Sequence, residues 1–199
     1  MPDWFTSRHV APGVLQVTEP FISDFYRANF YTVSGDAFDL QFDFGCGIRP
    51  LRPALPVSVL PVIAVASHAH IDHVGGLHEF DTRLGHAAEA EGFATMDKRL
   101  TLKNGFAANL FGPSLTQLPD PAYRLQDWDL VPAPLTGTIA EGDRIDLGNR
   151  SFTVLHLPPA IPPVASVCWM KSMAFCWQAM RFTMTDCWMI FPVLRCRIT

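Results

Sequence analysis

The sequence predicts a mixed α/β (α+β) domain in which short strands come first and strand–loop–helix units follow. Three observations support this prediction. Residues 40–44 read Leu-Gln-Phe-Asp-Phe, which is the alternation of a strand with one buried face. Residues 62–66 are all apolar, which is typical of a strand buried on both faces. Residues 87–96 combine Ala, Glu and Met at helix-favouring positions.

Further strands and two irregular stretches complete the expected domain. Strands are expected at residues 14–18, 30–33 and 152–157, with a strand–turn–strand arrangement over residues 138–151. Prolines at 50, 53 and 56 restrict any helix near them to a short or kinked one. Residues 105–137 are rich in proline, glycine and aromatic side chains, which indicates an insertion or a substrate-facing loop.

Composition and charge narrow the function classes. The chain has 199 residues, of which 49% are hydrophobic and 17% charged, so it can form one globular domain. The formal net charge of −4 argues against a nucleic-acid-binding protein, which usually carries a basic face. The first residues lack the basic and apolar regions of a signal peptide, and no apolar run reaches the roughly 18 residues of a transmembrane helix. We therefore expect a cytoplasmic enzyme without nucleic-acid or membrane partners, and the sequence leaves its oligomeric state open.

A compact cluster of histidines follows the buried strand at residues 62–66. His68 and His70 are two positions apart, so an extended segment places both imidazoles on one side, and Asp72 and His73 follow after a turn. Imidazole and carboxylate ligands together suit Zn²⁺, and also Fe or Mn. Two such groups can hold two metal ions that activate a water for attack on an acyl or phosphoryl centre. The pair Gly75-Gly76 is expected to let the backbone pass close to the metals.

Three histidines within six residues can also be a solvated His-rich loop or a chance cluster. The preceding buried strand, the ligand spacing, the aspartate and the glycine pair all favour a metal site. The remaining histidines show no such pattern. We interpret His78 and His86 as surface or supporting residues, and His9 and His156 as structural residues.

Residues 67–76, Ser-His-Ala-His-Ile-Asp-His-Val-Gly-Gly, resemble the His-x-His-x-Asp-His signature of the metallo-β-lactamase superfamily. The resemblance implies an αββα sandwich with a dinuclear metal site between its two sheets. It implies that His68 and His70 bind the first metal, and that Asp72 and His73 bind the second. It also implies a catalytic role for Asp72, which would handle the proton of the attacking water.

Other segments resemble one subgroup of this superfamily, the metallo-β-lactamase-domain proteins described as acyl-coenzyme A thioesterases. They are Asn29-Phe30, Asp43-Phe44-Gly45, residues 86–91 and residues 142–148. The similarity covers about the first 158 residues, which we assign to an incomplete metallo-β-lactamase-like domain (1–158), followed by an aberrant tail (159–199). The resemblance implies a small-molecule ester or thioester substrate such as an acyl-coenzyme A. Lactones, β-lactams, glutathione thioesters and phosphodiesters stay open, because fold does not fix function.

The resemblance stops where the remaining metal ligands of the family are due. After a strand like residues 152–157, the family continues with Pro-Gly-His-x-x-Gly, and later supplies a Gly-Asp and another His. This chain instead continues from Leu157 with Pro-Pro-Ala-Ile-Pro-Pro-Val, and no histidine follows His156. Asp186 is the one carboxylate of the tail, which also holds three of the five Trp, five of the seven Met and four of the five Cys.

Enrichment in Trp, Met and Cys is typical of translation in a wrong frame, because these residues have only one or two codons each. When the last base of each codon is read with the first two bases of the next, Trp169-Met170 becomes Asp and Met170-Lys171 becomes Glu. The same reading permits Gly-His within residues 159–164 and Gly-Asp within residues 178–181. We therefore hypothesise a frameshift near Pro158 or Pro159. The rival interpretations are a genuine variant tail that caps the domain or binds a partner, and a Cys/Met-rich metal tail, whose cysteine spacings match no zinc pattern.

The missing half of the sandwich lowers the stability, metal affinity and activity that we expect of this chain. An intact family member is expected to be a metal-dependent hydrolase, whereas this chain has at most four of the usual ligands and a sheet face left bare. We expect it to fold poorly, to bind metal weakly and to be inactive. The alternative is a non-catalytic binding or regulatory remnant with a vestigial metal site.

Overall fold

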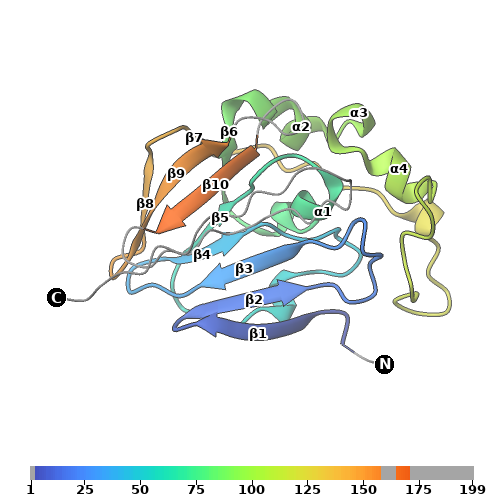
Figure 1. Ribbon diagram of the computed structural model, residues 1–199, viewed down its shortest axis with the longest axis horizontal. Helices are drawn as coiled ribbons and strands as arrows, with labels where there is room; N and C mark the ends of the chain where they lie inside the picture. The colour runs from blue at the N-terminus through green and yellow to red at the C-terminus, as the bar shows by residue number, and fades with distance from the viewer. Residues whose placement is uncertain (1–2, 158–164, 171–199) are drawn as a thin grey trace.

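The computed structural model describes residues 3–157 and 165–170, which form two β-sheets and a set of short helices (Figure 1). The large sheet has the order β1-β2-β3-β4-β5-β6-β7, and the small sheet has the order β10-β9-β8. The strands of the large sheet are β1 (Thr6–Ala11), β2 (Val14–Thr18), β3 (Asn29–Val33), β4 (Asp39–Phe42), β5 (Val62–Val65), β6 (Thr82–His86) and β7 (Gly137–Ile139). Those of the small sheet are β8 (Arg144–Asp146), β9 (Ser151–Leu157) and β10 (Ala165–Met170).

The helices of the described residues are short and follow the parallel strands. They are α1 (Ile71–Val74), α2 (Ala90–Thr95), α3 (Lys98–Thr101) and α4 (Lys103–Ala107), with 3₁₀ turns at η1 (Arg52–Ala54), η2 (Leu77–Glu79), η3 (Ala87–Glu89) and η4 (Leu125–Asp127). No helix among the described residues has the length and apolar character needed to cross a membrane.

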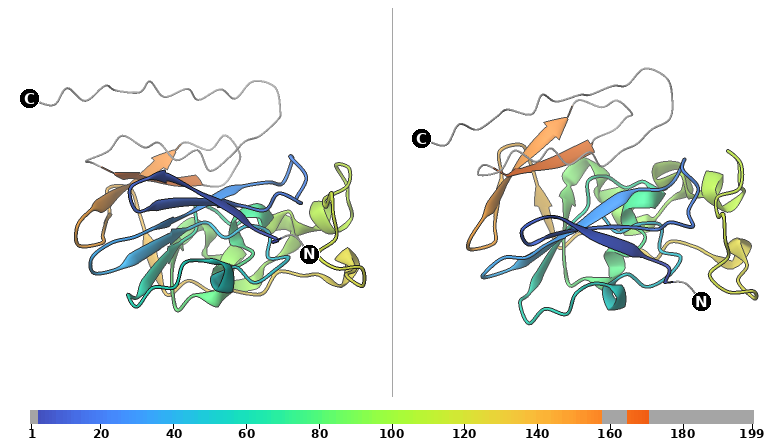
Figure 2. Two further views of the ribbon diagram at one scale, coloured as in Figure 1. Left: turned by 90° about the horizontal axis from the view of Figure 1, so that it is seen from below. Right: turned by 60° about the horizontal axis from the view of Figure 1, so that its bottom comes forward.

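Alternate residues of the large sheet enter two separate apolar cores. In β5, Ala64 packs into a core with helix residues such as Ile71 and Val74. Its neighbour Val65 packs instead with Phe152 and other residues of the small sheet. The large sheet therefore lies between the helices and the small sheet, as Figure 2 shows from two further directions. This confirms the prediction of a strand buried on both faces at residues 62–66. The face expected to be bare is covered in part by β8 and β9.

Five strands of the large sheet end at the same edge, where the loop with the histidine cluster lies. The pairs β1–β2, β2–β3 and β3–β4 are antiparallel, whereas β4–β5, β5–β6 and β6–β7 are parallel. Strands β2, β4, β5, β6 and β7 therefore run in one direction and end at the same edge. Helix α1 lies at this edge (Figure 1), and the segment that carries the histidines is there because it directly follows β5.

Several expected elements differ from the observed ones for identifiable reasons. The strand expected at residues 40–44 ends at Phe42, because Asp43 has a left-handed backbone with φ 58°. The helix expected at residues 87–96 is present as η3 and α2, and it ends where Met96 turns left-handed at φ 49°. The strands β7 and β8, expected together within residues 138–151, belong to different sheets.

Two observed strands were not predicted, and most of the predicted tail is not described by the structure. Strands β1 and β6 have no counterpart in the sequence-based prediction. Four of the six residues of β1 are exposed, so it carries no buried alternation and is held by its pairing with β2. The frameshift near Pro158 and most of the tail lie outside the described residues, so the structure leaves that hypothesis a prediction.

Candidate metal centre

The structure brings the three histidines of the predicted motif together. Strand β5 delivers the chain into an extended segment that ends at His70, and α1 begins at Ile71. The ring centroid of His68 lies 4.5 Å from that of His70 and 4.3 Å from that of His73. All three side chains are buried, and Asp72 is 18% exposed. The spacing of the motif therefore produces a compact cluster rather than a solvated loop.

A buried carboxylate that sequence reasoning missed holds this cluster. Asp43 Oδ2 lies 2.8 Å from His73 Nδ1, and the same carboxylate accepts hydrogen bonds from the Ser67 backbone N–H at 2.8 Å and the Ser67 hydroxyl at 2.9 Å. The Ser67 hydroxyl also lies 3.0 Å from His68 Nδ1. Because Asp43 contacts Nδ1 of the His73 ring, the other ring nitrogen, Nε2, is directed toward Asp72.

Two buried nitrogen atoms in the cluster have no hydrogen-bond partner, namely His68 Nε2 and His73 Nε2. The second lies 3.0 Å from Asp72 Oδ2, and the two groups form an ion pair when His73 is protonated. Buried polar atoms are seldom left unpaired, and a metal ion is one partner that satisfies imidazole nitrogens. The donor chemistry therefore fits a metal ion, although no three His, Cys, Asp or Glu side chains of residues 3–157 are arranged to hold one.

The three histidines of the cluster differ in the direction of their pKa shifts. Burial, with the charges of His73 and His70, holds the pKa of His68 well below its usual value, and burial also lowers the pKa of His70. Burial opposes charge on His73 as well, but Asp72 and Asp43 raise its pKa to about 10. The same interaction holds the pKa of Asp72 below its usual value against the effect of burial. His68 and His70 are thus neutral, as metal ligands must be, while His73 holds a proton that a cation would replace.

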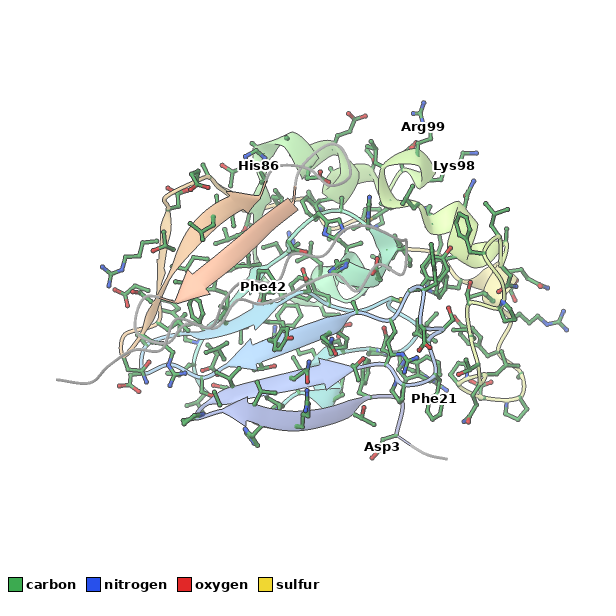
Figure 3. All side chains as sticks on the ribbon, viewed as in Figure 1. Asp3, Phe21, Phe42, His86, Lys98 and Arg99 are labelled. Atoms are coloured by element: carbon green, nitrogen blue, oxygen red, sulfur yellow. The ribbon has the colours of Figure 1, made fainter. Side chains whose placement is uncertain are left out.

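Three of the four remaining histidines make contacts away from the cluster or are exposed. His78 Nδ1 lies 3.1 Å from the Gly75 carbonyl, and His86 Nδ1 accepts the Ala88 N–H at 3.2 Å at the start of η3. Figure 3 shows His86 beside α2 at the top of the molecule. His9 is exposed on β1, and the side chain of His156 lies outside the described part of the chain.

Gly75 makes a different close approach from the one expected. A Cβ on this residue would lie 2.0 Å from Gly47 N and 2.2 Å from the Cys46 carbonyl carbon. The glycine is therefore required where α1 packs against the backbone of residues 45–47, and the expected approach to the metals stays a prediction. The Gly75 N–H donates to the Gly45 carbonyl at 2.8 Å, which fixes the end of α1.

Two buried glutamates near the cluster were also missed. Glu89 accepts the Ala69 N–H at 3.1 Å and so supports the extended segment between His68 and His70. Glu19 directly follows β2 and is 3% exposed. Both were hard to find because their partners lie 15 or more residues away along the chain.

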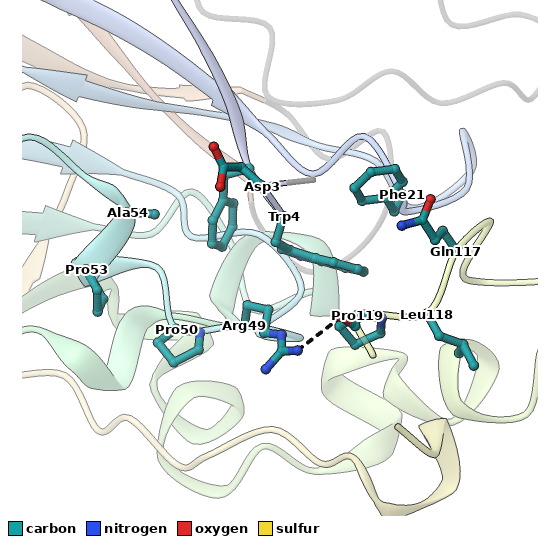
Figure 4. Close-up of a pocket in the computed structure, with 11 residues that line it drawn as sticks. Asp3, Trp4, Phe21, Arg49, Pro50, Pro53, Ala54, Gln117, Leu118 and Pro119 are labelled. Carbon is teal, nitrogen blue, oxygen red and sulfur yellow. Dashed lines mark hydrogen bonds between the residues drawn. The ribbon is translucent and has the colours of Figure 1, made fainter. Parts of the chain in front are cut away.

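A separate surface pocket of about 320 Å³ lies beside the N-terminal segment (Figure 4). Trp4, Phe21 and Leu118 supply apolar walls, and the Arg49 guanidinium is held by the Pro119 carbonyl at 3.1 Å and by Asp120 at 3.0 Å. None of the predicted site residues lines this pocket.

Comparison with known proteins decides the family. The model of the metallo-β-lactamase superfamily matches residues 42–172, which include the whole histidine cluster and Asp43. The chain belongs to the metallo-β-lactamase superfamily. It is 32% identical over 169 residues to the proteins of Homo sapiens and Bos taurus named acyl-coenzyme A thioesterase MBLAC2. Each match covers 78% of this chain and 59% of the relative, so the chain spans about three-fifths of their length.

Solved structures confirm the metallo-β-lactamase fold. The metallo-β-lactamase IND-7 aligns with a TM-score of 0.56 at 17% identity, over 85% of this chain and 67% of that one. The metallo-β-lactamase from Pontibacter korlensis aligns with a TM-score of 0.54 at 14% identity, over 83% of this chain and 66% of that one. These likenesses show the fold of this superfamily member and leave its substrate open.

Proposed function

We propose that this superfamily member is the metal-binding part of a hydrolase that acts on a small-molecule ester or thioester. His68, His70, Asp72 and His73 are the proposed ligands of one or two zinc ions, or of iron or manganese. The observation that carries the proposal is the buried cluster itself: His68 Nε2 has no hydrogen-bond partner, His73 Nε2 lies 3.0 Å from Asp72 Oδ2, and Asp43 fixes Nδ1 of His73. The relatives named acyl-coenzyme A thioesterase support an acyl thioester as the substrate.

Each residue of the cluster has a distinct task in this proposal. A bound metal ion would supply Lewis-acid activation of water and of the thioester carbonyl. Neutral His68 and His70 offer nitrogen lone pairs, and Asp43 keeps the His73 ring oriented with Nε2 toward the cluster. The lowered pKa of Asp72 keeps its carboxylate ionised, so it can accept the proton that the attacking water releases.

We further propose that the chain as it stands binds metal weakly and has little or no activity. The absence of any group of three suitably arranged ligands within residues 3–157 supports this. The same observation favours the second candidate function, a non-catalytic remnant with a vestigial site. The two candidates differ in turnover, because a binding remnant needs none.

The test is a paired measurement of metal content and acyl-coenzyme A hydrolysis on the purified chain. Zinc, iron and manganese are measured by mass spectrometry after dialysis, and released thiol is measured with a chromogenic disulfide. The His68→Ala and His73→Ala variants should lose bound metal, while His9→Gln, on the exposed strand β1, should retain it. Turnover equal to that of a full-length relative would contradict the proposed inactivity, and metal retained by both alanine variants would contradict the proposed ligands.

A further inference from the structure

Glu19 is a buried carboxylate whose two oxygen atoms accept hydrogen bonds from two distant segments. Glu19 Oε1 accepts the Trp4 indole N–H at 2.9 Å, and Glu19 Oε2 accepts the Cys46 backbone N–H at 2.7 Å. Trp4 lies in the N-terminal segment before β1, and Cys46 lies in the loop after β4. The carboxylate therefore links the N-terminal segment to the loop that follows Asp43.

The loop that Glu19 contacts is the one on which α1 rests. Gly45 and Gly47 are both left-handed, with φ 64° and 70°, and the Glu19 carboxylate lies directly against Gly45. The carbonyls of Phe44 and Gly45 accept the N–H groups of Gly76 and Gly75, at 3.2 Å and 2.8 Å. The backbone of residues 45–47 is thus packed against the residues that directly follow α1, which carries Asp72 and His73.

We infer that Glu19 is a positioning residue for the candidate metal centre: by holding Cys46, it fixes residues 45–47 and thereby the placement of Asp72, His73 and Asp43. The inference rests on the proposed metal-binding function and extends it to a residue that contacts none of the proposed ligands directly. Asp43 precedes the fixed segment by two residues, so one loop determines both His73 and the carboxylate that orients it.

The chemistry of the two contacts explains why this residue is a glutamate. Both partners are donors, so an ionised carboxylate satisfies both with its two acceptor oxygens. A glutamine can present its carbonyl to only one of them, and its NH₂ group must then face the other donor. Glu19→Gln therefore keeps the shape of the side chain while it breaks one of the two contacts.

The surroundings of Glu19 shift its pKa in opposing directions. Burial raises the pKa of Glu19 to about 7, the Trp4 and Cys46 hydrogen bonds oppose this rise, and the negative charge of Asp72 adds to it. The thiol of Cys46 faces the same region, and burial together with Glu19 raises its pKa well above the usual value.

A substitution of Trp4 tests the inference independently of Glu19. Its ring lines the surface pocket (Figure 4). Its indole N–H donates to Glu19, so this hydrogen bond can be removed without a substitution in the loop or in the histidine cluster. Trp4→Phe removes one donor. In the Glu19→Gln/Trp4→Phe double variant, the glutamine carbonyl can face Cys46 and its NH₂ group no longer meets a donor.

The experiment makes two measurements: zinc affinity by chelator competition, and the rates of amide hydrogen exchange at Gly75 and Gly76. Both are made on wild type, Glu19→Gln, Trp4→Phe and the double variant. Glu91→Gln, the same change at an exposed position of α2, is the matched control. We expect Glu19→Gln to lower zinc affinity by about tenfold or more and to speed both exchange rates. Adding Trp4→Phe should lower the affinity of wild type but raise that of Glu19→Gln, a reversal that simple loss of packing does not produce.

The outcomes separate the inference from the proposed function. Zinc affinity in Glu19→Gln within twofold of wild type, with unchanged exchange at Gly75 and Gly76, overturns the inference. An equal loss of affinity from Trp4→Phe in both backgrounds also overturns it. If wild type itself binds no zinc, the proposed function fails, and the exchange rates alone then decide whether Glu19 holds the end of α1.

Discussion

Asp43 and His73 lie 30 residues apart in the chain and are joined at 2.8 Å between Oδ2 and Nδ1, with both side chains fully buried. Asp43 makes this contact from a left-handed backbone conformation that also ends β4. The polar residue at the end of an otherwise regular strand is therefore part of the site rather than an interruption of the sheet. The relationship determines which nitrogen of His73 is free to bind a metal.

The Asp43→Asn variant tests this relationship. Asparagine tolerates the left-handed backbone, so the change removes the charge without adding backbone strain. We expect zinc affinity to fall by roughly 10–100-fold, because the His73 ring loses its charged acceptor. Chelator competition measures the loss, and Asp81→Asn on the exposed surface is the control. An Asp43→Asn protein with wild-type affinity would show that the contact does not tune the metal centre.

The pH dependence of stability tests the buried state of Glu19. Its pKa is raised from 4.5 to about 7, so the folded protein binds this proton more tightly than the unfolded chain does. The associated stabilisation is complete below pH 4.5 and is lost as the pH rises through 7, by an amount of about 3 kcal/mol.

Urea unfolding between pH 4.5 and pH 8 measures this effect. Wild type should lose more unfolding free energy over this range than Glu19→Gln, which cannot titrate. Parallel profiles for the two proteins would mean that folding does not raise the pKa of Glu19.

Gly75→Ala tests the packing of α1 on residues 45–47. The new Cβ would meet backbone atoms at 2.0–2.2 Å, and backbone cannot rotate away, so we expect a loss of about 3 kcal/mol in unfolding free energy. Gly137→Ala is the control, because its Cβ would meet only the end of the Leu84 side chain, at 2.9 Å, and should cost about 1 kcal/mol or less. Equal losses in both variants, measured by denaturant unfolding, would contradict the requirement at Gly75.

The parts of the fold that the sequence predicted are those with a local signal. Strand β5 and the histidine cluster are adjacent in the chain, and an apolar run followed by spaced ligands needs no distant partner to be recognised. The strand β1 has no such pattern, because its residues are mostly exposed and its structure comes from pairing with β2.

The supporting residues of the site could not be predicted for a related reason. Glu19, Asp43 and Glu89 act through hydrogen bonds to residues 20 to 30 positions away, at Cys46, His73 and Ala69. Asp43 and Glu89 lie in segments that resemble the family, but nothing in the local sequence shows that the three carboxylates are buried or which residues they contact. Only the shared edge at which β2, β4, β5 and β6 end brings them together.

Zinc binding by the histidine cluster tests the central claim most directly. Equilibrium dialysis against buffered zinc, followed by mass spectrometry, compares wild type with the His68→Ala/His73→Ala double variant. We predict saturable binding of zinc by wild type and its loss in the double variant, with far-ultraviolet circular dichroism confirming that both are folded. Identical zinc content in the two folded proteins would contradict the assignment of His68, Asp72 and His73 and their neighbours as a metal centre.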